Sequence, residues 1–337
     1  MSNNVVKPIK PTLIMLVGIP ASGKSVYAEQ LNTFNEWHIH SSDSLREEMF
    51  ANRFDTEHNG ELFTELYKRI KADLNNCINV IYDATNLSKK RRIAFLDYIG
   101  DICYKWCHVI AVPYELCLAQ NYKRTYSVPD HVMARMYRNF EPPHWSEGWD
   151  NIKIVLNYDR ERYKILEDTY SLGEMMESTR SFNQHNEHHT LTLYRHLLTT
   201  VVKLDEIEGT LNKFTGIYFP PNNISSNLYK AARYHDIGKL FTKSFVNHKH
   251  EIDGNAHFYQ HHCVGAYVVM LGLMFENEAT RKSVADIIEI INYIYYHMHP
   301  LTKWKQSEKA MEKDRQLLGD EMFNNICILS AADESAR

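Results

Sequence analysis

The chain of 337 residues lacks several features that define specialised protein classes. Its six cysteines form no Cys-x-x-Cys pair, which argues against a disulfide framework and favours free thiols in a reducing cytosol. No uncharged apolar run approaches the ~18 residues that a membrane span needs. The opening Met1-Ser2-Asn3-Asn4 does not start a charged-then-apolar signal segment. We therefore expect a cytoplasmic protein with no membrane partner.

The chain also lacks a strong charge of either sign, a low-complexity tract and an internal repeat. A net charge of −4 excludes a protein that attracts nucleic acid over its whole surface, so any such binding must use a local patch. The run 89–92 (Lys-Lys-Arg-Arg) is one candidate, and Arg124, Arg135 and Arg138 form another. A solvated helix face gives the same pattern, and this alternative stays open.

The length suits two domains, and the hydrophobic pattern changes near residue 158. Short apolar runs predict buried parallel strands at residues 12–18, 37–40, 80–83, 108–112 and 152–156, with helices between them. From residue 190 onward only helical periodicity is visible. We predict an α/β domain with helices on both faces of a parallel sheet (1–158), a helical junction (159–184) and an all-α domain (185–337).

A glycine-rich loop follows the first predicted strand. Gly18-Ile-Pro-Ala-Ser22-Gly23-Lys24-Ser25 matches Gly-x-x-x-x-Gly-Lys-Ser, in which backbone amides and a helix N-terminus surround phosphate groups. Lys24 is expected to reach the β- and γ-phosphates, and Ser25 is expected to hold Mg²⁺. The loop therefore predicts a nucleoside triphosphate, ATP or another NTP, with Mg²⁺.

The acceptor of the phosphoryl group must be recognised at the ends of the next strands, where ligands collect in such sheets. Asp43 follows the second strand and is placed to accept the proton of an attacking hydroxyl, although Asp is also a common helix N-cap. Arg46 lies one helical turn further on and is able to hold an anionic group.

The third strand ends in Asp83-Ala84-Thr85-Asn86 and is followed by the basic run 89–92. Residues 12–156 resemble the phage-type 5′-hydroxyl polynucleotide kinases. The resemblance rests on three motifs in this order: the phosphate loop, Asp-x-x-Arg and Asp-x-Thr-Asn. Lys123-Arg124, Val128-Pro129 and a helix with Met133 and Arg135 resemble that family's lid. The resemblance implies that Asp43 is the general base and that Arg124 clamps the donor phosphates. It also implies that Arg46, Asp83, Thr85 and Asn86 face the substrate, with Asp83 orienting the site by pairing with Arg46.

The second half is rich in histidine. His235-Asp236 lies in an apolar, helix-like stretch that stops at Gly238, and imidazole with carboxylate suits Mn²⁺, Fe²⁺, Ni²⁺, Co²⁺ or Zn²⁺. The order His, His-Asp, His, His, Asp over residues 185–337 resembles the HD superfamily of metal-dependent phosphohydrolases. Gln260 stands where that family often has glycine. The resemblance implies that one metal is bound by His196, His235, Asp236 and Asp333. It implies that His261 and His297 complete a second metal site or contact the scissile phosphate, and that Lys239 contacts the phosphate. His262 and His299 stay open as alternatives to His261 and His297.

Together the two halves resemble bifunctional enzymes that heal RNA ends. Such an enzyme phosphorylates a 5′-hydroxyl with ATP and removes a 2′,3′-cyclic, 2′- or 3′-phosphate, so that a separate ligase can join the break. The expected partners are RNA or DNA ends, with broken tRNA-like RNA favoured, and the oligomeric state is open, a homo-oligomer included. The alternatives are a small-molecule or nucleoside kinase fused to a nucleotide phosphohydrolase, and a nucleotide-gated HD hydrolase that acts as a sensor.

Overall fold

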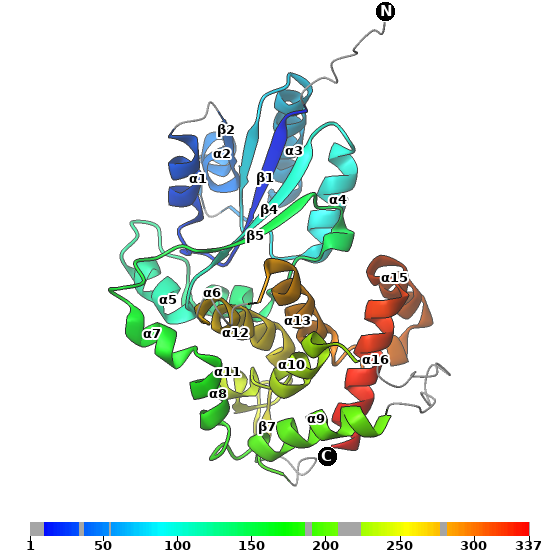
Figure 1. The fold of residues 1–337 in the computed structure, drawn as a ribbon. Coiled ribbons are helices and arrows are strands. Elements are labelled where there is room, and N and C mark those ends of the chain that lie inside the picture. The colour runs from blue at the N-terminus through cyan, green and yellow to red at the C-terminus, as the bar shows by residue number, and fades with distance from the viewer. Residues whose placement is uncertain are drawn as a thin grey trace, which may run out of the picture. The chain divides into compact units, whose positions relative to one another are not determined.

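A computed structural model describes residues 10–33, 37–53, 55–185, 191–207, 224–276 and 282–336. The chain forms two compact units (Figure 1). The sheet unit comprises the residues up to Val128 together with Glu147–Tyr158, and the helical unit comprises Pro129–Ser146 and Asp159–Arg337. Residues 129–146 thus group with the helical unit, and the domain boundaries at 158 and 184 stay predictions. His188 and His189 precede the first predicted helix of the second half, where the sequence favours loop or substrate-facing residues over metal ligands; both lie outside the described residues.

The sheet unit contains five parallel strands in the order β2-β3-β1-β4-β5. They are β1 (Thr12–Val17), β2 (His38–Ser41), β3 (Val80–Asp83), β4 (Tyr104–Ala111) and β5 (Asn151–Leu156). Strands β1 and β3 are almost fully buried because neighbouring strands and covering helices exclude water from both faces. Since all five strands run the same way, their carboxyl ends meet at one edge.

Helices α1 (Lys24–Asn32), α2 (Ser42–Phe50), α3 (Asn59–Asn75), α4 (Lys89–Ile99) and α5 (Tyr114–Tyr122) complete the sheet unit. Helix α3 buries one apolar stripe, Leu62, Leu66, Ile70 and Leu74, at the spacing of successive helical turns. Helix α2 starts where the Ser41 hydroxyl caps its first turn by accepting from the Ser44 amide. Because Ser41 is also the last residue of β2, this cap places Asp43 at the carboxyl edge of the sheet.

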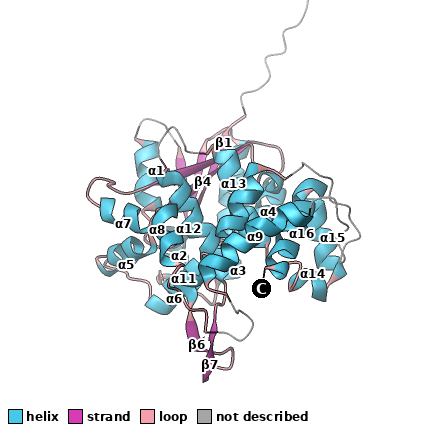
Figure 2. Cartoon of the chain, turned by 60° about the horizontal axis from the view of Figure 1, so that its bottom comes forward, coloured by secondary structure: helices cyan, strands magenta, loops and turns pink. Residues whose placement is uncertain are grey.

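Where the structure describes it, the helical unit contains helices and one β-hairpin. Its helices are α6 (Asp130–Arg138), α7 (Lys164–Thr169), α8 (Leu172–Ser178), α9 (Leu193–Ile207), α10 (Ser226–Tyr234), α11 (Lys239–Thr242), α12 (His261–Phe275), α13 (Val284–Tyr296), α14 (Lys303–Gln306), α15 (Glu308–Leu318) and α16 (Asp320–Ser335). The expected all-α pattern missed the antiparallel strands β6 (Ser244–Val246) and β7 (Ile252–His257), magenta in Figure 2. These strands are short and largely exposed, so they carry little apolar pattern.

Residues 129–146, to which the sequence assigned no clear role beyond a lid, pack inside the helical unit. Met133 and Tyr137 on α6 are buried, and the Tyr137 and Phe140 rings both meet the Tyr267 ring edge-on. The Asn292 side chain donates to the Pro143 carbonyl at 3.0 Å. Among all the residues described, no helix is long and apolar enough to cross a membrane.

Candidate functional site

The phosphate loop joins β1 to α1 in the sheet unit. Gly23 adopts a left-handed conformation (φ 78°), which favours glycine, and a Cβ added there would lie 2.5 Å from the Asn157 amide nitrogen, so the Asn157 side chain would have to move. Lys24 follows as the first residue of α1, and its Nζ donates to the Ile19 carbonyl at 2.8 Å. Burial lowers the pKa of Lys24, against the opposing charges of Asp83 and Asp43. The loop thus holds a buried cation at a helix N-terminus.

Asn157 contributes to this loop, although the sequence analysis did not single it out. Its side-chain nitrogen donates to the Ser22 carbonyl at 3.1 Å and to the Gly23 carbonyl at 3.0 Å. Asn157 directly follows β5, so a polar residue at the carboxyl end of a parallel strand was the signal that could have identified it.

Asp83 lies beside the phosphate loop rather than beside Arg46. Its carboxylate accepts the Ser25 hydroxyl at 2.6 Å, whereas Arg46 donates to Asp43 at 3.2 Å and to Asn59 at 3.2 Å. The expected pairing of Asp83 with Arg46 is therefore wrong. The end of β3 lies next to the end of β1, and this adjacency brings Asp83 to the loop. A hydroxyl beside a carboxylate is a donor set that suits Mg²⁺.

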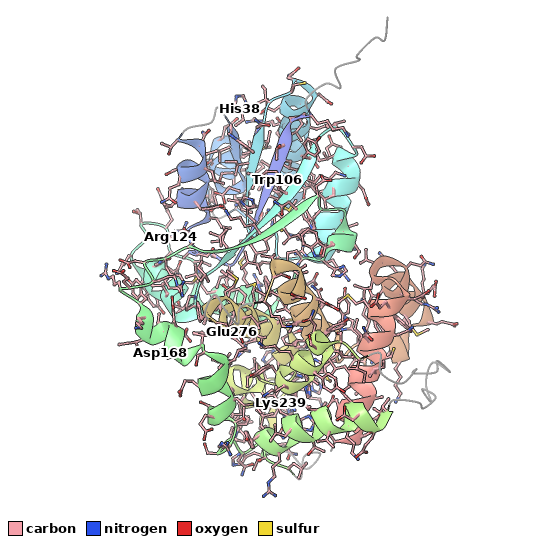
Figure 3. The ribbon with its side chains drawn as sticks, in the orientation of Figure 1. His38, Trp106, Arg124, Asp168, Lys239 and Glu276 are labelled. Atoms are coloured by element: carbon pink, nitrogen blue, oxygen red, sulfur yellow. The ribbon has the colours of Figure 1, made fainter. Side chains whose placement is uncertain are left out.

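Asp43 is half-exposed at the start of α2, with 45% of its side chain accessible. Its neighbours are two cations, Arg46 at 3.2 Å and Arg53 at 3.9 Å. The charges of Asp43, Asp83 and Arg124 all act on Lys24, so these residues share one electrostatic neighbourhood. Arg124 is exposed at the end of α5 (Figure 3). The structure therefore gathers the accessible Asp43 carboxylate, three arginines and the phosphate loop at one edge of the sheet.

Two residues in the loop after β3 contribute to its structure. Asn86 takes a left-handed φ of 46° and donates through its side chain to the Leu16 carbonyl at 2.9 Å. The Thr85 carbonyl accepts the Gly18 amide at 3.0 Å. These hydrogen bonds fix the loop after β3 against the phosphate loop. The Asn86 side-chain amide, which was expected to contact substrate, therefore binds the backbone of β1.

Arg92 is buried and belongs to no basic patch. It is 1% exposed and forms a two-pronged ion pair with Glu147, with both N···O distances at 2.7 Å. A further nitrogen donates to the Asn86 and Leu87 carbonyls at 3.0 Å. The expected patch at 89–92 therefore loses its last member, because a buried carboxylate 55 residues away takes up this charge.

The second candidate site lies in the helical unit, where four histidines and two aspartates converge. These side chains form two groups of possible metal ligands, and Asp236 belongs to both. The groups are His196, His235, Asp236 and Asp333, and Asp236, His261 and His297. Asp236 Oδ2 lies 3.4 Å from His196 Nε2 and 3.6 Å from His235 Nε2, and its Oδ1 lies 3.0 Å from His261 Nε2 and 3.6 Å from His297 Nε2. Asp333 completes the first group, with Oδ1 at 3.1 Å from His196 Nε2.

All four imidazoles are oriented by backbone carbonyls. The Nδ1 atoms of His235, His261 and His297 each lie 2.6–2.8 Å from the carbonyl three residues earlier, and His196 Nδ1 lies 3.3 Å from the Ala336 carbonyl. A carbonyl can only accept, so Nδ1 carries the hydrogen and Nε2 faces the centre of the cluster. This arrangement is the usual support for metal-binding histidines, and the donor set therefore fits divalent metal ions.

His235 and Asp236 lie in a turn, whereas the sequence predicted that they lie on a helix that stops at Gly238. Helix α10 ends at Tyr234 and α11 begins at Lys239. The break reflects close packing, since a Cβ on Gly238 would lie 2.0 Å from the His261 carbonyl. Helix ends also supply His261, the first residue of α12, and His297, which caps α13. Backbone turns thus bring the ligands together.

The electrostatics of this cluster favour a cation at its centre. Burial opposes ionisation of Asp236 and Asp333, but the charge of His235 and the hydrogen bonds of the neighbouring histidines hold the pKa of both aspartates well below their usual range, and the charge of Lys239 adds to this effect at Asp236. Burial lowers the pKa of His196, but the two carboxylates more than reverse this effect and raise it to about 9. Two buried carboxylates therefore draw positive charge to this point.

Lys239, which was expected to contact phosphate, is buried and paired in this structure. Its Nζ lies 2.6 Å from Asp236 Oδ2 and donates to the Gln184 side-chain oxygen at 3.0 Å. Gln184 is 2% exposed and donates in turn to the Leu191 carbonyl at 3.2 Å. No local sequence pattern marks Gln184, because its partner Lys239 lies 55 residues away.

The two open alternatives, His262 and His299, lie outside both ligand groups. Their rings pack against each other and against Tyr295 instead. Gln260 takes a left-handed φ of 61° just before His261. Such a conformation favours glycine, and a glutamine occupies it here. The turn that presents His261 is thus kept here at some backbone cost.

Similarity to known proteins indicates the protein class of the sheet unit. The AAA domain family profile matches residues 13–143, less than half of the chain. L-seryl-tRNA(Sec) kinase of Methanococcus maripaludis is 26% identical over 207 residues, which cover 58% of this chain and 76% of that protein. Protein kti12 of Schizosaccharomyces pombe is 25% identical over 161 residues, which cover 44% of this chain and 57% of that protein.

Solved structures show only low global similarity. A chain of the Pnkp1/Rnl/Hen1 RNA repair complex is 23% identical with a TM-score of 0.37, over 41% of this chain and 46% of that one. A putative kinase from Chloroflexus aurantiacus is 14% identical with a TM-score of 0.35, over 49% of this chain and 97% of that one. The chain thus spans less than half of the repair-complex protein.

The fold and the first site define a class. The sheet unit is a P-loop domain of kinase type, built on a parallel sheet with a phosphate loop after its central strand. Domains of this class bind ATP with Mg²⁺ and transfer its terminal phosphoryl group. The chain is therefore a kinase-like, nucleotide-binding protein that carries a second, helical unit.

Proposed function

We propose that the chain heals nucleic-acid ends, with a 5′-hydroxyl polynucleotide kinase in the sheet unit and an HD-type phosphoesterase in the helical unit. The observation that carries this proposal is the pairing of a phosphate loop with a buried cluster of four inward-facing imidazoles and two carboxylates. One site donates a phosphoryl group, and the other is equipped to hydrolyse a phosphate ester.

In the kinase reaction Lys24 holds the β- and γ-phosphates, and Ser25 and Asp83 hold Mg²⁺. Asp43 accepts the proton of the attacking 5′-hydroxyl, which its accessible carboxylate can reach from solvent. Arg46 holds the substrate phosphate next to that hydroxyl and Arg124 holds the donor phosphates, so charge on both sides of the transferred group is balanced. Thr85 and Asn86 shape the acceptor side of the site.

In the phosphoesterase reaction a divalent transition metal would be held by His196, His235, Asp236, His261, His297 and Asp333. When bound, such an ion would supply a water of lowered pKa and would offset negative charge on the phosphoryl oxygens. Lys239 carries a positive charge 2.6 Å from Asp236, beside the place where the phosphate group binds. The substrates are 2′,3′-cyclic, 2′- or 3′-phosphate ends.

An RNA substrate, tRNA-like in particular, is supported by the curated relative whose name is L-seryl-tRNA(Sec) kinase. An acidic chain with a few exposed arginines suits gripping one end rather than a long duplex. We place the protein in the cytoplasm, upstream of a separate ligase, with DNA 5′ ends as further kinase substrates.

Separating the two activities tests the proposal. Asp43→Asn is expected to abolish 5′ phosphorylation and to leave the phosphoesterase intact, and His235→Ala is expected to do the reverse. Glu57→Gln, a change of an exposed carboxylate outside both sites, serves as the control. Loss of both activities in either folded variant would contradict the two-site account. An Asp43→Asn chain with full activity would favour the nucleotide-gated sensor, and phosphorylation of nucleosides but not oligomers would favour the small-molecule kinase.

A further inference from the structure

A third group of metal-type side chains lies in the sheet unit, outside both sites described above. It consists of His38 and His40 on strand β2 and Asp73 in the last turn of helix α3. Because side chains alternate along a strand, His38 and His40 point to the same face. Figure 3 places His38 at the end of the sheet unit away from Arg124. The group is thus remote from the kinase edge.

The ligand atoms already lie close to coordination spacing. Asp73 Oδ2 is 2.8 Å from His38 Nδ1 and 2.7 Å from His40 Nε2, and the three ligand atoms lie within 4.8 Å of one another. In a tetrahedral zinc site with bonds of about 2.0–2.1 Å, ligand atoms are about 3.3 Å apart. A shift of a few tenths of an ångström at each side chain therefore makes room for an ion.

We propose that His38, His40 and Asp73 form a binding site for a divalent transition metal of the zinc class. Imidazole and carboxylate are the ligands such ions prefer. The His38 side chain is 54% exposed, which leaves a fourth position open to water. On binding, each neutral imidazole moves its hydrogen from the coordinating nitrogen to the other ring nitrogen, so no proton is gained or lost by the pair.

A comparison within the same unit indicates what is special about this group. His58 Nδ1 also lies 3.0 Å from an aspartate, Asp55, but this pair belongs to no group of three metal-type ligands among the residues described. One imidazole with one carboxylate is an ordinary surface pair. Two imidazoles on one carboxylate oxygen, supplied by a strand and a helix, give the three ligands that an ion requires.

An ion at this site would link two elements. Strand β2 is the outermost strand of the sheet and leads directly into α2, where Asp43 lies. Since an ion that binds only the folded chain stabilises it, zinc is expected to raise the midpoint of thermal unfolding of the sheet unit. The inference does not depend on the proposed end-healing activity.

The test is a zinc titration of the metal-stripped full chain against a chromophoric chelator. His40→Gln keeps a hydrogen-bond donor to Asp73 and removes a ligand, and His58→Gln is the matched control. We expect His40→Gln to bind one zinc equivalent fewer than the unchanged chain, and His58→Gln to bind the same number. Equal stoichiometry in all three chains would overturn the proposal.

Two additions keep the test decisive. Zinc is also expected to bind in the helical unit. The titration is therefore repeated in chains that carry Asp236→Asn, and the chain with His40 must still bind more zinc than the chain with His40→Gln. If His40→Gln fails to fold by circular dichroism, His38→Gln replaces it, because that side chain is largely exposed. A zinc-dependent rise in the unfolding midpoint that is the same with and without His38 would also contradict the site.

Discussion

Glu147→Ala should destabilise the sheet unit strongly, although residue 147 lies in neither site. Glu147 is 5% exposed, accepts two hydrogen bonds from Arg92 at 2.7 Å and accepts a third from Trp149 at 3.1 Å. Removing the carboxylate leaves a guanidinium buried without its counter-charge. Breaking one partner of such a buried pair costs about 3–5 kcal/mol in the free energy of unfolding.

The change should also reach the kinase edge. Arg92 donates to the carbonyls of Asn86 and Leu87, so a guanidinium that moves toward water would release the loop after β3. The Thr85 carbonyl in that loop holds the Gly18 amide. We therefore expect weaker binding of ATP by the folded variant, visible as a raised KM for ATP.

Hydrogen exchange of the slowest amides in β1 measures the free energy of unfolding of the sheet unit. Glu48→Ala is the control, because Glu48 makes a similar two-pronged pair with Arg69 at 2.8 and 2.9 Å but lies at the surface. Water screens that pair, so its loss should change stability little. Equal losses for Glu147→Ala and Glu48→Ala would refute the argument from burial.

Three further predictions follow from single contacts. Gly23→Ala should weaken ATP binding in an equilibrium dialysis assay, because its Cβ would strain a residue of positive φ and displace the Asn157 amide nitrogen 2.5 Å away; normal affinity would contradict the loop geometry. Burial lowers the pKa of His108 to about 4. Below pH ~6.5 the unfolded chain binds a proton at His108 that the folded chain does not bind, so the free energy of unfolding falls by up to about 3 kcal/mol between pH ~6.5 and pH ~4. In urea unfolding, the free energy of unfolding of His108→Gln should depend less on pH. An unchanged pH dependence would refute this cause. Asp236→Asn should lower the metal content of the helical unit more than Asp333→Asn in elemental analysis, because Asp236 belongs to both ligand groups; equal losses would contradict the shared carboxylate.

The sheet was predictable from the sequence because its strands are short apolar runs that end at polar residues. The expected strand at 80–83 coincides with β3, and the phosphate loop follows β1 as expected. The hairpin of β6 and β7 was missed, since a mostly solvated hairpin leaves no hydrophobic alternation to detect.

The candidate sites were predictable only in part, because their contacts join distant residues. The adjacent His235 and Asp236 are visible as a local pair, but Asp333 and His196 reach them only through the packing of α16 and α9. From the sequence, Arg92 was expected in a basic patch or on a solvated helix face. No local pattern indicates that its partner is residue 147. Tertiary packing therefore decided the surroundings of every one of these charges.

Both proposed activities can be followed on a single RNA oligomer. An RNA oligomer with a 5′-hydroxyl and a 2′,3′-cyclic phosphate is incubated with the full chain, ATP, Mg²⁺ and Mn²⁺, Ni²⁺, Co²⁺ or Zn²⁺, and its mass is determined. The account predicts the gain of a phosphate at the 5′ end together with the loss of the terminal phosphate at the other end. An oligomer unchanged at both ends would contradict it.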